Sequence, residues 1–243
     1  MRSQICHILA LSLAAGLLAG CDGEPQANAK VVAPPVAMGA GVVRGNVNFA
    51  GTPPMMEVIA NKPCHPGAPM IAEETVVVTD GRLANVFVYV KDAPNVNAPM
   101  AEPALLDQKH CQYVPHAVGV RIGQTLRIRS SDDTMHNVHY NPSRNKAENF
   151  GFTTVGAEKT LRFAHPEFMR MKCDVHPWMM AYVGVFDSPF FVVTPVAGNF
   201  EIKGLPAGTY TLATWHEQLG EQEQTVTIAD GQSVTANFEY KGP

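Results

Sequence analysis

The sequence predicts an all-β protein built from β-sandwiches or barrels. Short runs of alternating apolar and polar residues recur along the chain at nearly regular spacing, a pattern typical of sandwiches and barrels. Turn-forming pairs such as Asp80-Gly81 and Asp230-Gly231 separate these runs, and the chain holds 20 glycines and 19 prolines. No long helical pattern is present in the sequence.

The alternating runs give the expected elements in chain order. We expect strands over residues 42–49, 75–78, 84–90, 124–129, 160–163, 200–202, 210–213 and 224–228. Residues 141–145 and 149–156 are expected to form loops, and residues 166–169 one helical turn.

The N-terminal segment has the features of a secretory signal peptide. Met1-Arg2-Ser3 precedes an apolar run from Ile8 to Leu18, which is shorter than the ~20 residues that a transmembrane helix needs. The run ends in Leu18-Ala19-Gly20-Cys21, which resembles the lipobox of bacterial lipoproteins. This resemblance implies a signal peptide over residues 1–20 and a lipid anchor on Cys21. Ordinary cleavage that leaves Cys21 unmodified is the alternative.

Residues 21–40 are rich in Pro, Ala, Asn and Gly and are expected to form a flexible tether. Asp22, directly after Cys21, resembles a signal for retention in the inner membrane, so we expect a periplasmic protein anchored there. The net charge of −4 and the pI near 6.1 argue against nucleic acid as a partner, because nucleic-acid binding needs a basic face.

Two imidazoles, a thiolate and a thioether form the main candidate site. His136-Asn137-Val138-His139 precedes the run from Cys173 to Met179, in which His176 and Met179 follow Cys173 at intervals of three. Two His ligands, one Cys and a weak axial Met select copper for electron transfer. His136 and His139 lie three apart, so on a strand they point to opposite faces and only one binds. Met180 competes with Met179 for the axial position.

The segment that carries these donors resembles the cupredoxins, and the amicyanins most closely among them. Residues 120–126, 135–139 and 173–179 carry the likeness. It implies that His136, Cys173, His176 and Met179 bind one blue-copper ion. It also implies that Asn137 hydrogen-bonds around the Cys173 sulfur and holds the two ligand loops together.

Other segments resemble the two halves of a different domain. Residues 41–54 and 83–90 would open it, and residues 199–212, with the run Gly204-Leu205-Pro206-Ala207-Gly208-Thr209-Tyr210, would close it. Together they resemble a carboxypeptidase regulatory-like, transthyretin-like β-sandwich, although Ala197-Gly198 replaces the usual Asp-Gly turn. The two resemblances together imply that residues 41–102 and 188–243 form one small β-sandwich, and that residues 103–187 are inserted in it as a Greek-key sandwich or barrel, the copper domain. The ends of such an insertion must lie close together.

The five cysteines divide by role. Cys6 leaves with the signal peptide, Cys21 carries lipid and Cys173 binds metal, which leaves Cys64 and Cys111 in an oxidising compartment. We expect a Cys64–Cys111 disulfide. A second metal site that combines Cys111 with His110, His116 or His65, and two free buried thiols, are the alternatives.

The remaining conspicuous residues are expected to be structural. We expect Trp215-His216-Glu217 to form a turn and His165-Pro166 a loop. Packing is the commoner use of methionine, so Met55, Met56, Met169 and Met171 are expected to fill gaps in the core.

The sequence thus predicts a lipid-anchored electron carrier that cycles between Cu(II) and Cu(I). Electrons would pass through the edge of His176, with Pro177, Trp178 and Met180 as a small apolar docking patch, to a c-type cytochrome or periplasmic dehydrogenase. Copper oxidases need further His-rich sites, and no His-x-His or His-Cys-His run occurs, so we expect no enzyme activity. A copper carrier or sensor, and a β-sandwich scaffold without a working metal site, are the alternatives.

Overall fold

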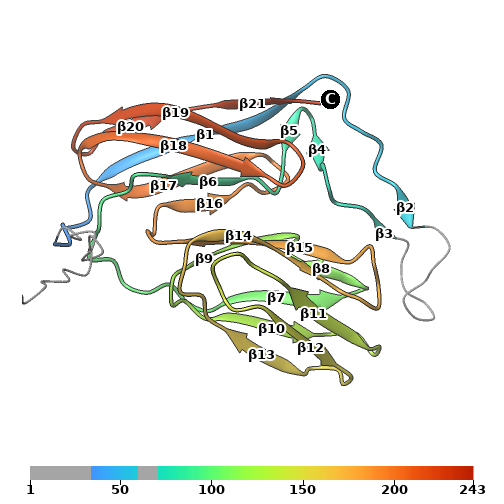
Figure 1. Ribbon diagram of the computed structural model, residues 1–243. Helices are drawn as coiled ribbons and strands as arrows, with labels where there is room; N and C mark the ends of the chain where they lie inside the picture. The colour runs from blue at the N-terminus through green and yellow to red at the C-terminus, as the bar shows by residue number, and fades with distance from the viewer. Residues whose placement is uncertain (1–33, 60–70, 243) are drawn as a thin grey trace, which may run out of the picture. The chain divides into compact units, whose positions relative to one another are not determined.

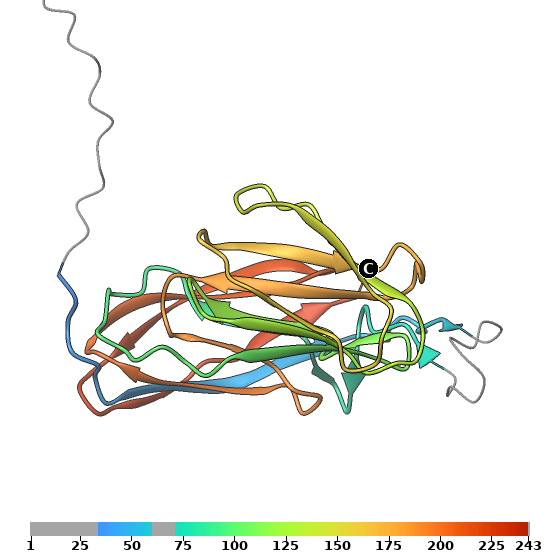
Figure 2. The ribbon, with the colours of Figure 1, turned by 90° about the horizontal axis from the view of Figure 1, so that it is seen from below.

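Strands form all of the regular structure in residues 34–59 and 71–242, the parts of the chain that the computed structural model describes. The all-β prediction is therefore confirmed. Apart from a two-stranded sheet of β2 (Val58–Ile59) and β3 (Ile71–Ala72), the strands make two pairs of packed sheets, drawn at the top and the bottom of Figure 1. In the view from below, most strands run lengthwise in roughly one direction (Figure 2).

The first pair of sheets contains strands from both ends of the described chain. One sheet has the order β17-β1-β5-β4, with β20 and β21 also paired to β1, and the other has the order β16-β6-β18-β19. Their bounds are β1 (Gly41–Ala50), β4 (Val78–Thr79), β5 (Arg82–Leu83), β6 (Phe87–Val90), β16 (Phe191–Val193), β17 (Asn199–Leu205), β18 (Gly208–His216), β19 (Gly220–Ile228), β20 (Ser233–Thr235) and β21 (Phe238–Lys241). Buried Val43, Val47, Val88 and Leu212 lie in the core between them.

The second pair of sheets is made by the middle of the chain. One sheet has the order β13-β10-β7-β8 and the other β12-β11-β14-β15-β9. Their bounds are β7 (Ala104–Lys109), β8 (Gln112–Val114), β9 (Ala117–Arg121), β10 (Leu126–Ser130), β11 (His136–Tyr140), β12 (Glu148–Phe152), β13 (Glu158–Leu161), β14 (Glu167–Lys172) and β15 (Met180–Phe186). Alternation places Leu126 and Ile128 in the core and turns Arg127 and Arg129 outward.

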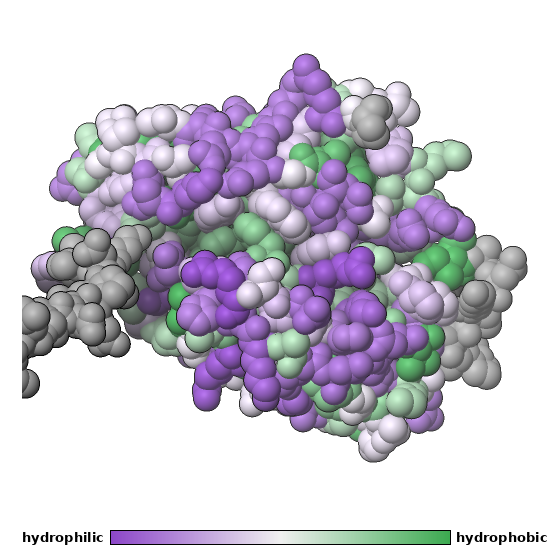
Figure 3. All heavy atoms as spheres, in the orientation of Figure 1, coloured by the Kyte–Doolittle hydropathy of each residue, from purple (hydrophilic) through white to green (hydrophobic). Residues whose placement is uncertain are grey.

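The outward positions of the second pair are strongly polar. Arg127 pairs with Glu158 at 2.7 Å, and Arg129 pairs with Asp107 at 2.5 Å. On the face drawn in Figure 3, hydrophilic residues accordingly cover much of the lower half, where this pair of sheets lies. The outer surface of the β10 sheet is thus a solvated face.

The chain leaves the first pair of sheets and returns to it at one place. β6 ends at Val90 and β16 begins at Phe191, and these two strands are antiparallel neighbours. The Val90 amide donates to the Phe190 carbonyl at 3.0 Å. Everything between β6 and β16 is therefore held between two adjacent points of one sheet. The boundaries at residues 103 and 187 stay a prediction, since residues 33–243 form a single compact unit.

An aromatic layer joins the two pairs of sheets. Phe87 and Trp215 from the first pair meet Phe168 and Phe186 from the second, and the rings of Phe168 and Trp215 stack with centroids 4.4 Å apart. Packed aromatic pairs of this kind contribute about 0.5–1.5 kcal/mol each beyond the area that they bury. The β6 sheet therefore has a core on one face and this layer on the other.

Several local expectations were wrong. Trp215 and His216 belong to β18 and not to a turn, and Met55 is exposed and does not fill a gap in the core. Residues 166–169 do not form a helical turn, because β14 begins at Glu167, and Met169 and Met171 alternate into the core as on a strand. Residues 149–156 are not all loop, because β12 occupies Glu148–Phe152. Val36 and Gly39, expected in the tether, bond to Asn95 and Gly204 of the folded unit. Residues 1–33, with the predicted signal peptide and Cys21, lie outside the described residues.

Candidate metal site

The site lies at one end of the second pair of sheets, where three segments meet. β11 begins at His136, and its antiparallel neighbour β14 ends at Lys172, with His139 opposite Lys172. Because neighbouring antiparallel strands run in opposite directions, the start of β11 lies near the end of β14. His136 and Cys173 are thereby brought to the same end, although 36 residues separate them.

The loop between β14 and β15 supplies the remaining candidate ligands. The Cys173 amide donates to the Met179 carbonyl at 3.0 Å, and the Met179 amide donates to the His176 carbonyl at 2.8 Å. These two bonds close a tight loop in which Cys173, His176 and Met179 are all buried. Pro177 fixes one backbone angle in it. A loop of this shape can direct three side chains to one point, which a strand cannot do.

The inner ring nitrogens of the two histidines and the Cys173 sulfur converge. His136 Nδ1 lies 3.1 Å from His176 Nδ1, and Cys173 Sγ lies 3.7 Å from His176 Nδ1. His136 also hydrogen-bonds to the Cys173 side chain. With tetrahedral angles, an ion about 2.0 Å from each nitrogen and about 2.3 Å from sulfur would separate the nitrogens by about 3.3 Å and sulfur from nitrogen by about 3.5 Å. The observed spacing therefore fits a metal with an N₂S donor set.

Hydrogen bonds prepare Cys173 to act as a thiolate. Burial acts to raise the pKa of its thiol, but the bond from His136 and those from the amides of Asn137, His176 and Val175 outweigh burial and lower it. The pKa of His176 is also lowered, first by burial and then by the nearby His136. A thiolate and a neutral imidazole are the protonation states in which these groups bind metals.

The outer nitrogens of the two rings have other partners. His136 Nε2 lies 2.9 Å from Asp132 Oδ2, and both groups are buried. A carboxylate on the far nitrogen of an imidazole fixes which nitrogen is free for a metal and increases its basicity. Here it leaves Nδ1, the nitrogen that faces His176 and Cys173.

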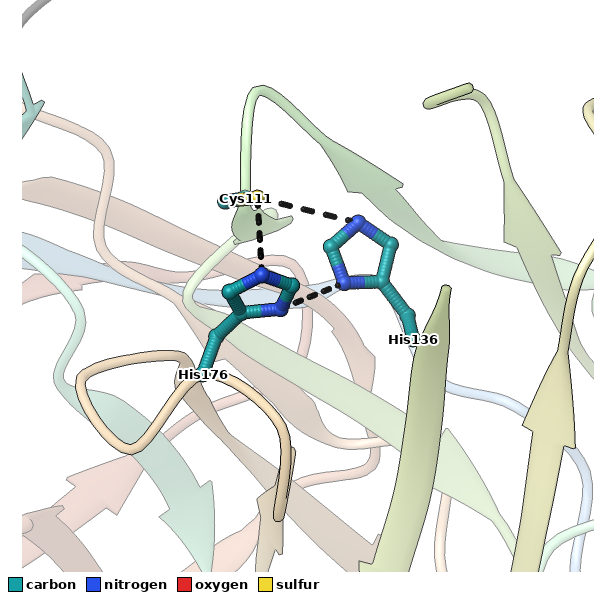
Figure 4. A group of neighbouring side chains, drawn as sticks. All are labelled: Cys111, His136 and His176. Carbon is teal, nitrogen blue, oxygen red and sulfur yellow. Dashed lines mark hydrogen bonds between the residues drawn. The ribbon is translucent and has the colours of Figure 1, made fainter. Parts of the chain in front are cut away.

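A second sulfur, that of Cys111, contacts the outer edge of the site. Figure 4 shows Cys111 above the two imidazoles, with Sγ 3.9 Å from His136 Nε2 and 3.7 Å from His176 Nε2. Cys111 is disulfide-bonded, so it offers no thiolate, and His136 Nε2 already bonds to Asp132. We therefore assign the metal position to the Nδ1 side with Cys173. Cys64, the partner predicted for Cys111, lies outside the described residues.

Cys111 reaches this position on a tight hairpin. Lys109 and Gln112 pair across the turn between β7 and β8, and the two turn residues, His110 and Cys111, have φ of 57° and 53°. Two-residue hairpins of this kind need positive φ at both positions, which non-glycine residues adopt at a cost. The Asp132 carboxylate accepts both of their amides, at 2.7 and 2.8 Å, which offsets that cost.

Asn137 connects the two ligand segments. Its side-chain oxygen accepts the Asp174 amide at 2.6 Å, and its side-chain nitrogen donates to the Asp174 carboxylate at 2.9 Å. The same nitrogen donates to the Asn149 side chain on β12 at 2.8 Å. Asn137 thus joins β11 to the Cys173 loop, next to the Cys173 sulfur that its own amide contacts.

The other sequence-predicted residues, His139, Met179 and Met180, differ in orientation and burial. His139 lies on the opposite face of β11 and pairs with Asp174 at 2.8 Å. Met179 is buried against the core of the second pair of sheets, whereas Met180 is partly exposed at the start of β15. His176 is only 8% exposed, so it does not present the open edge that was predicted, and Pro177 and Val175 are exposed beside it.

Sequence reasoning missed Asp132 and the contact of Cys111. Asp132 lies four residues before His136, outside a regular strand, so no periodicity connects the two. Trp178, expected in a docking patch, is partly exposed, and its indole nitrogen also donates to the Cys111 carbonyl at 3.1 Å. Neither the Asp132 nor the Trp178 contact could be read from spacing, because both depend on the β7–β8 hairpin.

No family model matches the chain, and none of the curated proteins matches it. Solved structures match part of it. The amicyanin of Paracoccus versutus is 18% identical with a TM-score of 0.31, over 41% of this chain and 97% of amicyanin. A purple cupredoxin of Nitrosopumilus maritimus is 18% identical with a TM-score of 0.30, over 35% of this chain and 100% of that one.

A copper-containing nitrite reductase of Thermus scotoductus SA-01 is 16% identical with a TM-score of 0.32. This match covers 41% of the chain described here and 25% of the reductase, so the chain spans about a quarter of that enzyme's length. At these TM-scores the likeness decides nothing about function, which has to be read from the side chains.

Proposed function

We propose that this chain is a blue-copper electron carrier, held at a membrane by a lipid on Cys21. The observation that carries the proposal is the buried convergence of His136 Nδ1, His176 Nδ1 and Cys173 Sγ, within a loop that also holds Met179. That donor set is the one that selects copper for electron transfer over hard cations.

Each residue has a distinct part in this function. His136, Cys173 and His176 would hold the ion, Met179 would supply the weak axial sulfur, and copper would supply the one-electron couple. Asp132 and Asn137 hold the ligands from two sides, so the donor atoms move little when the charge of the site changes. Burial excludes water, which keeps an open coordination position from forming and favours electron transfer over chemistry at the metal.

The partner that we propose is a c-type cytochrome or a periplasmic dehydrogenase. Because the His176 ring is covered, contact would be made by the exposed side chains next to it, Pro177 and Val175, rather than by the imidazole edge. Such redox contacts are small and weak, below about 1,200 Å² of total buried surface. A small site of this kind suits rapid association and release.

The test is the visible spectrum of the purified chain after addition of one equivalent of Cu(II). A thiolate-bound Cu(II) is expected to give an intense band at roughly 600 nm that disappears on reduction and returns on oxidation. A colourless protein that retains copper would contradict the electron-carrier function. Rapid transfer of the bound copper to a weak chelator would instead support the alternative function, that of a copper carrier.

The axial position can be tested with two neighbouring residues. Met179→Leu is expected to raise the reduction potential, because loss of a weak donor destabilises Cu(II) more than Cu(I). Met180→Leu, the matched control one residue on, is expected to leave the potential unchanged. Voltammetry of the two copper-loaded variants distinguishes them, and a reversed pattern would assign the axial sulfur to Met180.

The membrane anchor rests on the sequence Leu18-Ala19-Gly20-Cys21. In the described residues, no helix has the length and apolar character to cross a bilayer. Multiple acyl chains, at about 0.8 kcal/mol per buried CH₂, give stable attachment. Native protein is expected in the membrane fraction with an acylated N-terminus, and Cys21→Ala in the soluble fraction or uncleaved. Mass spectrometry that finds an unmodified Cys21 in the native protein would contradict the anchor.

A further inference from the structure

A second cluster of metal-binding side chains lies beside the proposed copper site and outside it. His116 precedes β9, Glu217 follows β18 in the first pair of sheets, and Glu74 follows the short strand β3 (Ile71–Ala72), which pairs with β2 (Val58–Ile59). β3 lies next to the β7–β8 hairpin in Figure 1, and Gln112 donates to the Ala72 carbonyl at 3.2 Å. Segments distant in sequence therefore meet at one point.

Among the described residues, only one of the two ring nitrogens of His116 has a hydrogen-bond partner. Its side chain is 6% exposed, and its Nε2 hydrogen-bonds to the carboxylate of Glu217, which is 4% exposed. Its other nitrogen, Nδ1, lies 3.8 Å from Glu74 Oε2, too far for a hydrogen bond. A buried carboxylate behind an imidazole is the arrangement that orients a metal-binding histidine. His116 Nδ1 is left for a ligand.

The space in front of His116 is a small cavity. Its volume is about 20 Å³, which is room for one water-sized ligand or ion, and its lining includes Glu74, Gln112 and Met180. The lining also includes Trp178 and Met179 of the proposed copper loop. Glu74 is 42% exposed, so the cavity can be reached from solvent.

Negative charge is in excess around this cavity. The Oε2 atom of Glu217 is buried and has no hydrogen-bond partner among the described residues. The Tyr182 hydroxyl lies close to the same carboxylate. Burial, followed by repulsion from Glu217, raises the pKa of Glu74 against the opposing effect of His116. Two carboxylates thus flank a single imidazole, and a cation would relieve their repulsion.

We propose that this cavity binds a divalent transition-metal ion through His116 Nδ1 and the Glu74 carboxylate, with Glu217 as the positioning residue. Imidazole and carboxylate are ligands that suit zinc-like and Cu(II) ions rather than Cu(I), which prefers sulfur. Water completes the coordination shell on the exposed side. The site uses neither His136 nor Cys173, so it does not depend on the electron-carrier function.

A purely structural role makes a different prediction. If His116 is a protonated imidazole that bridges Glu217 and Glu74 as an ion pair, the cavity needs no cation. Zinc would then bind no more tightly to this chain than to a variant without Glu74. The two possibilities separate in a direct binding measurement.

The experiment uses the full chain, first equilibrated with one equivalent of Cu(II) and then dialysed against micromolar Zn(II), with both metals counted by elemental mass spectrometry. The native chain is expected to retain one zinc ion, and Glu74→Gln to bind it about tenfold more weakly or worse. Glu102→Gln, which removes an exposed carboxylate elsewhere, should match the native chain. Glu74 is partly exposed and its side chain makes no hydrogen bond with the described residues, so its loss should not unfold the protein.

Three outcomes decide the proposal. Zinc retention that falls in Glu74→Gln and His116→Gln, but not in Glu102→Gln, supports it. Equal retention in native protein and Glu74→Gln, or no retention in either, overturns it. Loss of copper together with unchanged zinc binding would contradict the electron-carrier function alone, so the two failures can be told apart.

Discussion

Replacement of Cys173 by serine is expected to abolish the intense visible band of the Cu(II)-loaded protein completely. The band needs a thiolate bound to copper, and Cys173 Sγ is the sulfur that faces the inner nitrogens of both histidines. A serine hydroxyl is a hard, neutral donor and cannot replace a soft thiolate. Absorption spectra of the two proteins at equal copper content measure the effect.

The fold is expected to survive this change. Serine is close in size to cysteine, and the amides of Asn137, His176 and Val175 can bond to its oxygen. Circular dichroism and the thermal midpoint of the copper-free proteins provide the control. If the variant keeps the band, the metal is bound by another sulfur and our assignment of the site is wrong.

Asp132→Asn is expected to weaken copper binding by about 10- to 100-fold, the usual effect of removing a carboxylate behind a metal-binding imidazole. The same change also affects the hairpin. The carboxylate accepts the amides of His110 and Cys111 as well as His136 Nε2, and an amide nitrogen in place of one oxygen cannot accept. We expect the free energy of unfolding to fall by about 1–3 kcal/mol.

Asp133→Asn is the matched control, because Asp133 is the neighbouring acid and is exposed. It should leave both copper affinity and stability unchanged. Competition titration with a chelator of known affinity measures the first quantity, and urea unfolding of copper-free protein the second. If Asp132→Asn binds copper as well as Asp133→Asn does, the carboxylate does not support the ligand.

Stability should also depend on pH through Asp132. Burial acts to raise its pKa, but the bonds from Cys111, His110 and His136 outweigh burial, so the pKa in the folded state is lower than in the unfolded state. The unfolded chain therefore binds the proton more readily. The stabilisation is present above the unfolded pKa, about 3.9, and is lost as the pH falls towards the lower folded value.

Many strands could be predicted from the sequence because the alternation of buried and exposed side chains lies within each strand itself. The alternation over β1, β10 and β19 follows from one buried and one solvated face, so residues 42–49, 124–129 and 224–228 were expected as strands from their own side chains. β14 was not expected, because its run Glu167–Lys172 mixes charged residues with methionines and follows a proline. Its strand character comes from pairing with β15, a contact that spacing does not reveal.

The residues of the candidate site likewise fall into those that spacing predicts and those that only the folded chain brings together. Cys173, His176 and Met179 share one loop, so their spacing alone brought them together, and the choice of His136 over His139 followed from alternation on a strand. Asp132 and Cys111 contact the site only because the β7–β8 hairpin folds over the imidazoles. Glu217 reaches His116 across 101 residues and between two pairs of sheets, so no sequence pattern could connect them.

Two glycines shape the junction beneath the aromatic layer. Gly119 on β9 and Gly184 on β15 lie opposite each other in register. A methyl group at Gly119 would come within 2.7 Å of the Phe191 ring, and one at Gly184 within 2.8 Å of the Phe87 ring. The absence of side chains at these two positions therefore leaves room for aromatic rings of the first pair of sheets.

This packing limits whether residues 103–187 can be excised or joined to another protein. A fragment of residues 103–187 would expose to solvent the glycine and aromatic surface that now packs against the first pair of sheets. The rest of the chain would expose Phe87, Phe191 and Trp215. Contiguous apolar patches of this kind promote association and aggregation. The segment that holds the proposed copper site therefore cannot be exchanged as an independent unit. If residues 103–187 were joined to another protein, that protein would need aromatic side chains in the positions of Phe87, Phe191 and Trp215. We therefore expect the two pairs of sheets to occur together in related proteins.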